Sequence, residues 1–344
     1  MAEDLSPLRI GFVGVGTMGQ VAHLANYATL DGCRVVAIAE LRPLLAQRVA
    51  ARYGVPKVYP TADAMVRAED LDAIVHINQF GFHGQTVPAL AAAGKPMLIE
   101  KPLANSVETA RRIISSLSAA PLYLAYHKRS DPATMYAVGL IEQWKTSGEF
   151  GAMRFVRVCM PPGDWTAGGM TAVLRTDEKV PPSEPDPAPA DMPPERWRYY
   201  GYLVNYYIHQ VNLLRHLLGD YEVTYADPTG VLMAAQGKNG VAATIEMGTH
   251  RTSNAWREEA TVFFERAWVR IELPAPLAVN RPGRVVIYRE PPGQTPETLV
   301  PDLKPVHAMR QQAVNFLAAL RGQPTPLATA QTGLEDLRTM QKYL

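Results

Sequence analysis

Three glycines near the start of the chain constrain its fold more than any other feature. Gly14, Gly16 and Gly19 form the pattern GxGxxG, which follows the apolar run Arg9–Val13. In a βαβ unit the first glycine permits a tight turn, the second lets the backbone approach a pyrophosphate, and the third lets helix and strand pack closely. The helix that follows presents its N-terminus to the phosphates. The pattern therefore predicts a dinucleotide-binding unit.

An acidic residue at the end of the next apolar run supports this prediction. Glu40 follows Arg34–Ala39 and lies 21 residues after Gly19. A carboxylate at this place accepts hydrogen bonds from the adenosine ribose hydroxyls and repels the 2′-phosphate of NADP, so we expect NAD rather than NADP. Arg42 is either a solvated loop charge or a residue that softens this preference. The expected dinucleotide contacts in this region are Gly14, Gly16, Thr17, Met18, Gly19 and Glu40.

The composition excludes several classes of protein. A chain of 344 residues suits two domains, because single cores stop growing near ~250–300 residues. The 34 Lys and Arg residues nearly balance the 33 Asp and Glu residues, so nothing indicates nucleic-acid or anionic-membrane binding. No apolar run reaches the ~18 residues of a membrane helix. Cys33 and Cys159 show no metal or redox spacing, and we expect no metal site and a reduced, cytoplasmic compartment.

The first 128 residues alternate apolar runs with amphipathic stretches, which is typical of a parallel α/β sheet. Strands are expected at Arg9–Val13, Arg34–Ala39, Lys57–Tyr59, Ala73–Ile77, Met97–Ile99 and Leu122–Tyr126. Helices are expected at Val21–Leu30, Leu44–Tyr53 and Thr86–Ala93. Another begins at Asn105, where Asn105 and Glu108 have the spacing of an N-cap and its reciprocal third residue. Residues 1–128 are therefore predicted to form a Rossmann domain with a doubly wound parallel sheet.

Residues 129–344 show a different pattern, and we assign them to a second domain. Asp131 and Pro132 predict an N-cap followed by proline at the first helical position. Strands are expected at Met153–Met160, Tyr221–Ala226, Val241–Met247, Thr261–Glu265, Val269–Glu272 and Arg284–Tyr288. Helices are expected at Tyr202–Leu218, Val306–Arg321 and Gln331–Tyr343. Turns and loops join most of these strands, so an α+β domain with a mostly antiparallel open sheet is predicted.

Residues 161–198 form a Pro-rich loop with nine prolines, too many for a helix or a strand. Two interpretations are open. The loop is either a solvated surface excursion or a lid, since long loops in compact domains often cover active sites. Aromatic residues in and beside it favour the lid: Trp165, Trp197, Tyr199, Tyr200 and Tyr202. Trp165 is expected to contact the substrate by stacking on a sugar ring, with anchoring of the loop as the alternative.

Residues 73–104, AIVHINQFGFHGQTVPALAAAGKPMLIEKPLA, resemble the Gfo/Idh/MocA family of sugar and cyclitol dehydrogenases. Members of this family share a similar strand, an asparagine-and-histidine loop, a helix ending in Ala-Gly-Lys, and then Glu-Lys-Pro. Residues 203–219, LVNYYIHQVNLLRHLLG, resemble the family's catalytic helix, and PLATAQTGLEDLRTM near the end resembles its last helix. The resemblance covers most of the chain. It implies an NAD(P)-dependent dehydrogenase that acts on CH–OH groups.

Lys101 is the first expected catalytic residue. It lies just past the carboxyl end of a predicted parallel strand, where open α/β sheets bind ligands. A lysine there can donate to a substrate hydroxyl or lower its effective pKa while hydride is removed. The resemblance implies this role for Lys101 and cofactor contacts for Glu100 and Lys101. A surface lysine at the start of a helix is the alternative.

The catalytic helix departs from the family pattern. Asn205, His209 and Asn212 lie at i, i+4 and i+7 and share one helical face. Similar enzymes carry Asp, His and Asp at these places. An amide can orient a hydroxyl but cannot take up a proton, so acid–base chemistry is expected to rest on His209. Asn205 and Asn212 are expected to bind the substrate. The alternative for His209 is a satisfied core histidine, and His216 is interpreted as structural.

Two further strand ends carry candidate residues. Asn78 and His83 follow the fourth strand, where the family places nicotinamide-ribose contacts. Asn78 and Gln79 stand where the family has Thr and Pro, and His83 is either a cofactor contact or a structural cap. Lys128 follows the sixth strand, where the family often has basic residues near the substrate. We expect Lys128 to contact the substrate.

These observations predict hydride transfer between the nicotinamide and a secondary alcohol of a sugar, glycoside or cyclitol. Two alternatives remain open. One is a glycoside hydrolase or lyase that retains NAD and recycles it, because oxidation at one carbon acidifies its neighbour. The other is a catalytically reduced paralogue that binds NAD and a sugar, because Asn205 replaces the usual Asp. Small molecules are the expected partners, without nucleic acid or membrane, and family analogy predicts a homodimer or homotetramer.

Overall fold

The computed structural model describes residues 6–117, 119–161, 163–189, 192–248, 252 and 255–343. The chain divides into two compact units. The first unit comprises Met1–Tyr126, Gly169–Trp197 and Gln312–Leu337, and the second comprises His127–Gly168, Arg198–Gln311 and Arg338–Leu344. The chain thus returns twice to the first unit after the single boundary expected at residue 128.

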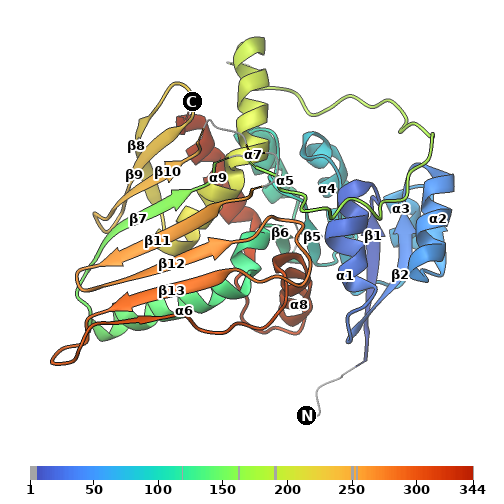
Figure 1. The fold of residues 1–344 in the computed structure, drawn as a ribbon. Coiled ribbons are helices and arrows are strands. Elements are labelled where there is room, and N and C mark those ends of the chain that lie inside the picture. The colour runs from blue at the N-terminus through green and yellow to red at the C-terminus, as the bar shows by residue number, and fades with distance from the viewer. Residues whose placement is uncertain are drawn as a thin grey trace. The chain divides into compact units, whose positions relative to one another are not determined.

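The first unit is built on a seven-stranded sheet in the order β15-β6-β5-β4-β1-β2-β3 (Figure 1). Its strands are β1 (Leu8–Val13), β2 (Cys33–Ala39), β3 (Lys57–Tyr59), β4 (Ala73–His76), β5 (Met97–Ile99), β6 (Leu122–Leu124) and β15 (Ala328–Thr329). All neighbours are parallel except β15, which pairs antiparallel with β6. The predicted Rossmann fold is confirmed. The strand order reverses beside β1, and such sheets bind ligands at the carboxyl ends of the strands there.

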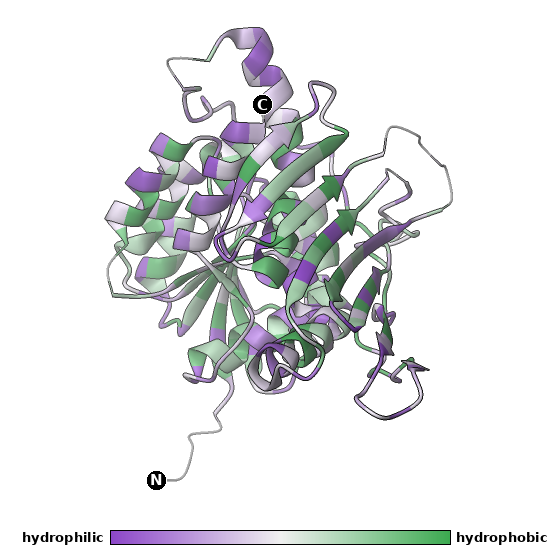
Figure 2. Ribbon diagram, turned by 90° about the vertical axis from the view of Figure 1, so that its left-hand side faces the viewer, coloured by the Kyte–Doolittle hydropathy of each residue, from purple (hydrophilic) through white to green (hydrophobic). Residues whose placement is uncertain are grey.

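Helices connect these strands. They are η1 (Gly19–Leu24), α1 (Ala25–Tyr27), α2 (Pro43–Tyr53), α3 (Ala62–Ala68), η2 (Phe80–Phe82), α4 (His83–Ala91) and α5 (Val107–Ser116). The first, η1, is a π-helix, a wide turn that is frequent at functional sites. Figure 2 shows hydrophobic and hydrophilic residues alternating along the helices, as expected when one face packs on a core.

The N-cap expected at Asn105 is wrong. Ser106 caps α5, because its hydroxyl accepts the Thr109 N–H at 3.1 Å. The Asn105 amide instead donates to the Asp186 carbonyl at 2.8 Å. Both residue types favour an N-cap, and here a tertiary hydrogen bond of Asn105 leaves the capping position to its neighbour.

The second unit contains an eight-stranded sheet in the order β14-β13-β12-β11-β7-β10-β9-β8. Its strands are β7 (Met153–Cys159), β8 (Tyr221–Ala226), β9 (Leu232–Gly237), β10 (Ala242–Glu246), β11 (Glu258–Phe264), β12 (Ala267–Leu273), β13 (Arg284–Arg289) and β14 (Glu297–Leu299). Within the described residues only β7 and β10 pair in parallel. The predicted mostly antiparallel sheet is therefore confirmed.

The remaining helices are η3 (His127–Ser130), α6 (Pro132–Ser147), α7 (Pro194–Leu218), α8 (Ala308–Leu320) and α9 (Ala330–Tyr343). Asp131 caps α6 as predicted, since its carboxylate accepts the Ala133 N–H at 2.8 Å. No helix among the described residues combines the length and apolarity needed to span a membrane.

The Pro-rich loop matches its prediction only in part. Residues 163–189 contain neither helix nor strand. The helix expected from about Tyr202 nevertheless begins at Pro194, so the expectation that residues 161–198 exclude a helix is wrong at their end. Proline fits the first turn of a helix because it lacks the N–H that would be left unpaired there.

Candidate functional site

Two glycines of the GxGxxG loop are required by close packing. Gly14 has φ +83°, and a Cβ placed on it would lie 2.2 Å from the Ile77 carbonyl oxygen. A Cβ on Gly19 would lie 2.4 Å from the Gly14 carbonyl oxygen. Both distances are too short for any side chain, so only glycine lets β1 turn into η1 beside β4.

Gly16 is required for another reason. The single atom within 4 Å of a Cβ on Gly16 is Arg42 Nη2, at 3.5 Å. The space in front of this peptide is therefore open, although Gly16 lies between two tightly packed glycines. Thr17 and Met18 follow it and are partly exposed. An open glycine before a helix N-terminus fits a pyrophosphate, and these residues fit a dinucleotide.

Glu40 lies immediately after β2 and is almost completely buried. Its Oε2 accepts the Val15 N–H of the glycine loop at 3.0 Å. Arg42 donates from Nε to Oε1 at 2.7 Å and from Nη2 to Oε2 at 3.1 Å. Glu40 thus fixes the glycine loop against the end of β2. Its carboxylate is already balanced by one arginine before any ligand binds.

Glu100 and Lys101 follow β5. His23, on η1, donates from Nε2 to Glu100 Oε1 at 2.8 Å, and Glu100 Oε2 accepts the Lys101 N–H at 3.0 Å. Burial by itself raises the pKa of Glu100, but the His23 hydrogen bond and the nearby charges of His23 and Lys101 outweigh it and lower that pKa. The ionised carboxylate therefore joins the helix of the glycine loop to the backbone of Lys101.

Asn78 and His83 both follow β4 but lie in different surroundings. Asn78 is exposed, and its Oδ1 accepts the Gln79 N–H at 2.8 Å. His83 is fully buried and donates from Nδ1 to the Leu103 carbonyl at 3.2 Å. Burial lowers the pKa of His83. The neutral ring packs against His76, with 5.3 Å between ring centroids. Their contacts with a cofactor stay predictions.

The three polar residues of α7 belong to the second unit and differ in exposure. Asn205 is exposed, His209 is partly exposed, and Asn212 is buried. The ring of His209 packs edge-to-face on His127, at 4.7 Å between centroids and an interplanar angle of 70°. This ring contact fixes the plane of the His209 imidazole. Its catalytic role, and the substrate contacts of the two asparagines, stay predictions.

Lys128 is buried and pairs with the carboxylate of Glu258 at the start of β11. Gln210 Nε2 donates to the other carboxylate oxygen at 2.7 Å. The Lys128 ammonium also lies 5.8 Å from the centroid of the Trp256 ring, within range of a cation–π contact. The substrate contact predicted for Lys128 stays a prediction, and it would use an ammonium that Glu258 already holds.

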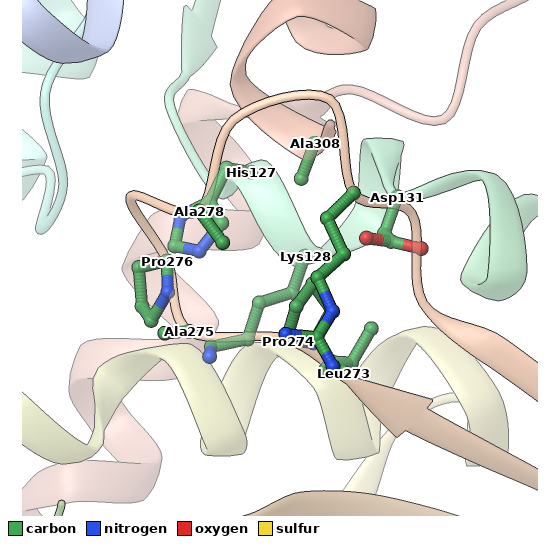
Figure 3. Close-up of a pocket in the computed structure, with 10 residues that line it drawn as sticks. His127, Lys128, Asp131, Leu273, Pro274, Ala275, Pro276, Ala278 and Ala308 are labelled. Carbon is green, nitrogen blue, oxygen red and sulfur yellow. The ribbon is translucent and has the colours of Figure 1, made fainter. Parts of the chain in front are cut away.

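A small pocket of the second unit opens beside Lys128 (Figure 3). It has room for about one water molecule. Asp131 lies at its edge and accepts N–H groups from Ala133 and Gly283. Burial raises the pKa of Asp131 to about 6. This pocket is too small for a sugar, so we assign it no ligand.

Trp165 is half-buried in the loop after β7, and its carbonyl accepts the Leu277 N–H at 3.2 Å. This bond involves the backbone and leaves the predicted stacking of the indole on a sugar as a prediction. Among the described residues, no three His, Cys, Asp or Glu side chains are grouped closely enough to hold a metal ion.

Residues 8–126 match the model of an oxidoreductase family with an NAD-binding Rossmann fold. The match includes the glycine loop, Glu40 and Lys101. The Gfo/Idh/MocA family model thus matches about the first third of the chain. Inositol 2-dehydrogenase of Pseudomonas fluorescens is 37% identical over 110 residues, which are 32% of this chain and 33% of that enzyme. The chain thus matches about a third of this relative's length.

Solved structures resemble nearly the whole chain. An oxidoreductase from Agrobacterium radiobacter in complex with NAD⁺, L-tartaric acid and magnesium has a TM-score of 0.70 and 14% identity, covering 98% of this chain and 95% of that one. Apo scyllo-inositol dehydrogenase from Lactobacillus casei has a TM-score of 0.67 and 17% identity, with the same coverage. At these identities the likeness shows the fold. The Rossmann domain and the antiparallel sheet of this chain thus have solved counterparts.

Two polar residues near the site are not singled out by the sequence patterns. His23 stands four residues after Gly19. It is a lone histidine among mainly apolar residues of that helix, and this contrast is the sequence signal that could have identified it. Glu258 is buried at the start of β11, and no local pattern indicates that Lys128 is its partner.

A segment of the Pro-rich loop also contacts the glycine loop. We name residues 172–186 the strap; they belong to the first unit. The Gln20 side chain accepts the Leu174 N–H at 2.9 Å and donates to the Leu174 carbonyl at 3.1 Å. The same amide donates to the Val15 carbonyl at 2.9 Å. The strap therefore binds the GxGxxG loop through one buried glutamine, and it passes α1 and α2 in Figure 1.

The strap is held at two more helix N-termini. Glu178 accepts the N–H groups of Leu44 and Leu45 at the start of α2. Asp186 accepts the Gly84 N–H in the first turn of α4 at 2.7 Å. These helices follow β2 and β4, and Gln20 follows β1. The strap thus borders the carboxyl ends of three adjacent strands, where dinucleotides bind to this fold.

Proposed function

We propose that the protein is a nicotinamide-dependent oxidoreductase that transfers hydride between the cofactor and a secondary alcohol of a sugar, glycoside or cyclitol. The observation that carries this proposal is the open peptide at Gly16 between two glycines that tolerate no side chain. Lys101, at the end of β5, supports it, because its backbone is tied to the same glycine-loop helix through Glu100. The inositol 2-dehydrogenase relative supports a cyclitol-like substrate.

We propose NAD rather than NADP as the cofactor. Support comes from the nearly buried carboxylate of Glu40 directly after β2, because an acidic residue there binds the ribose hydroxyls in this fold and would repel a 2′-phosphate. Titrating both dinucleotides by quenching of tryptophan fluorescence tests this preference. NAD is expected to bind more tightly, and a lower Kd for NADP would contradict the assignment.

Bound NAD would supply the hydride acceptor. Side chains of the protein would stabilise the substrate hydroxyl oxygen and accept its proton. Lys101 would donate to the substrate hydroxyl oxygen and stabilise its developing negative charge. His209 would accept the hydroxyl proton on a ring nitrogen. Asn205 and Asn212 would orient neighbouring hydroxyls through their amides. Lys128 and Trp165 are proposed as further substrate contacts.

A panel of cyclitols, aldoses and glycosides incubated with NAD tests the reaction class. The proposal expects at least one compound to give the absorbance of reduced nicotinamide together with a ketone product. Compounds that shift the melting temperature without any absorbance change or product would instead indicate a non-catalytic protein that binds NAD and a sugar.

The strap favours a second candidate, a glycoside hydrolase or lyase that retains NAD between turnovers. Its hydrogen bonds to Gln20, Leu44, Leu45 and Gly84 lie beside the carboxyl ends of three adjacent strands, where the cofactor is proposed to bind. A strap fastened in this way would slow cofactor release, as the lid interpretation of the Pro-rich loop expects. NAD that survives dialysis, with product formed but no net NADH, would support this candidate over the dehydrogenase.

We also propose a homodimer or homotetramer in the cytoplasm, as family analogy suggests. The eight-stranded sheet would offer its outer face for self-association. Light scattering of the purified protein measures the assembly state, and a monomer at micromolar concentration would contradict it.

A further inference from the structure

The strap brings a carboxylate to the loop that follows β2. Glu178 accepts the N–H of Leu44 at Oε1 and that of Leu45 at Oε2, both at 2.9 Å. Thr176 also donates to Oε2, at 3.0 Å. Burial by itself raises the pKa of Glu178, but these hydrogen bonds and the charge of Arg42 lower it. A full negative charge from the strap therefore occupies the first turn of α2.

The Glu178 carboxylate also interacts electrostatically with Arg42, the arginine that pairs with Glu40. In this fold an arginine near the end of β2 is the group that accommodates a 2′-phosphate. Arg42 has that position, but Glu40 holds its guanidinium at two nitrogen atoms. The charge of Arg42 also helps to lower the pKa of Glu178. Arg42 is therefore already paired with one carboxylate, and fewer of its N–H groups remain for a phosphate.

A groove beside α2 is lined by equal numbers of basic and acidic side chains. Its volume is about 420 Å³. Its lining residues are Leu44, Arg48, Arg175, Thr176, Asp177 and Glu178. The two arginines and the two acids of this groove cancel in formal charge. Without the charge of Glu178, the two arginines would face one acid, and the groove would attract an anion.

We infer that Glu178 is a specificity-determining residue, whose carboxylate on the strap excludes the 2′-phosphate of NADP and so favours NAD. This inference rests on the proposed function, in which the first unit binds a nicotinamide dinucleotide. A phosphate monoester carries about −1.5 to −2 charges at neutral pH, and each nearby carboxylate repels it. Glu40 provides one such carboxylate from the Rossmann fold, and Glu178 provides a second from the strap.

The test compares Glu178→Gln with Glu184→Gln in the full-length protein. Both variants remove one negative charge from the strap. The glutamine at position 178 keeps one oxygen that can accept an N–H of α2, while its NH₂ group replaces the second acceptor, so the capping is retained in part. The Glu184 side chain is exposed and has no hydrogen bond or ion pair in the part of the chain described above. The measured quantity is the ratio of the Kd for NADP to the Kd for NAD, by fluorescence titration at fixed ionic strength.

The expected result is a fall in this ratio of about tenfold for Glu178→Gln, mainly through tighter NADP binding, since one repulsive charge is removed at short range. Glu184→Gln should leave the ratio unchanged. Glu178→Asp keeps the charge and should keep the ratio near that of the unmodified protein.

Two other outcomes distinguish a failure of the inference about Glu178 from a failure of the proposed function. If Glu178→Gln changes both affinities by the same factor, Glu178 is a helix cap only and the inference is overturned, while the proposed function survives. If the unmodified protein binds neither dinucleotide, the proposed function is overturned and the inference falls with it.

Discussion

Glu40 and Glu100 of the first unit are held differently from Glu258 of the second. In the first unit, Glu40 and Glu100 stand directly after strand ends and accept backbone N–H groups. In the second unit, Glu258 accepts from the side chains of Lys128 and Gln210. A carboxylate bound to the backbone at a strand end has a position that the sequence can predict. A carboxylate bound to distant side chains has a position that only the structure reveals.

The largest effect should come from Lys101, the cation at a strand end of the first unit. Lys101→Met removes the donor to the substrate oxygen, and we expect kcat/KM to fall about 10⁴-fold while the Kd for NAD stays within about threefold. Steady-state kinetics and a fluorescence titration measure the two quantities. Lys95→Met is the matched control, since Lys95 precedes β5 at its opposite end. Full activity of Lys101→Met would remove this residue from the mechanism.

The next effect tests the side-chain pair of the second unit. Lys128→Met leaves the Glu258 carboxylate buried and without its cation, and we expect a loss of about 3–5 kcal/mol in the free energy of unfolding. Urea denaturation measures it. The double variant Lys128→Met/Glu258→Gln should recover most of this loss, because no unbalanced charge is then buried. A single variant as stable as the unmodified protein would show that the pair is solvated.

A smaller effect separates two glycines of the first unit. Gly14→Ala places a Cβ against the Ile77 carbonyl and requires an unfavourable φ, so we expect a loss of about 2–3 kcal/mol in unfolding free energy. Gly16→Ala meets open space and should change stability by less than about 0.5 kcal/mol. Thermal and urea unfolding of both variants measure the contrast. Equal stabilities would contradict the packing described for Gly14.

The smallest effect concerns Asp131 in the second unit, whose pKa is raised to about 6 by burial. The folded protein then binds this proton more tightly than the unfolded chain, so stability falls as the pH rises from about 4 to about 6. Asp131→Asn should remove this slope and add about 1–2 kcal/mol at pH 8. Asp302→Asn, at an exposed aspartate of the same unit, is the control. Urea unfolding across this pH range measures the slope, and an unchanged slope in Asp131→Asn would assign it to other groups.

Most of the fold follows from local patterns in the sequence. The six predicted strands of the first unit are all present, and most of them are apolar runs between turn-forming residues. By contrast β9 was not expected. Its sequence, LMAAQG, contains small and polar residues with low strand propensity. Pairing with β8 and β10 makes this segment a strand, and that pairing depends on residues outside it.

The residues of the candidate site also fall into two groups, those that local sequence patterns predict and those that only tertiary contacts place. The glycine loop, Glu40 and Lys101 could be placed from the sequence because strand ends fix their positions. The roles of His23 and Glu178 could not. His23 acts through Glu100, which is 77 residues away in the chain, and Glu178 caps a helix 134 residues before it. Such partners are chosen by tertiary folding, and no spacing rule links them.

The central claim is that the first unit binds NAD on its glycine loop. Calorimetric titration of the full-length protein with NAD tests it most directly, together with Gly16→Val, which fills the open space with a side chain. We expect saturable binding of one NAD per chain and at least a hundredfold weaker binding by a folded Gly16→Val, since the side chain would occupy the pyrophosphate position. No binding by the unmodified protein, or equal binding by the variant, would contradict it.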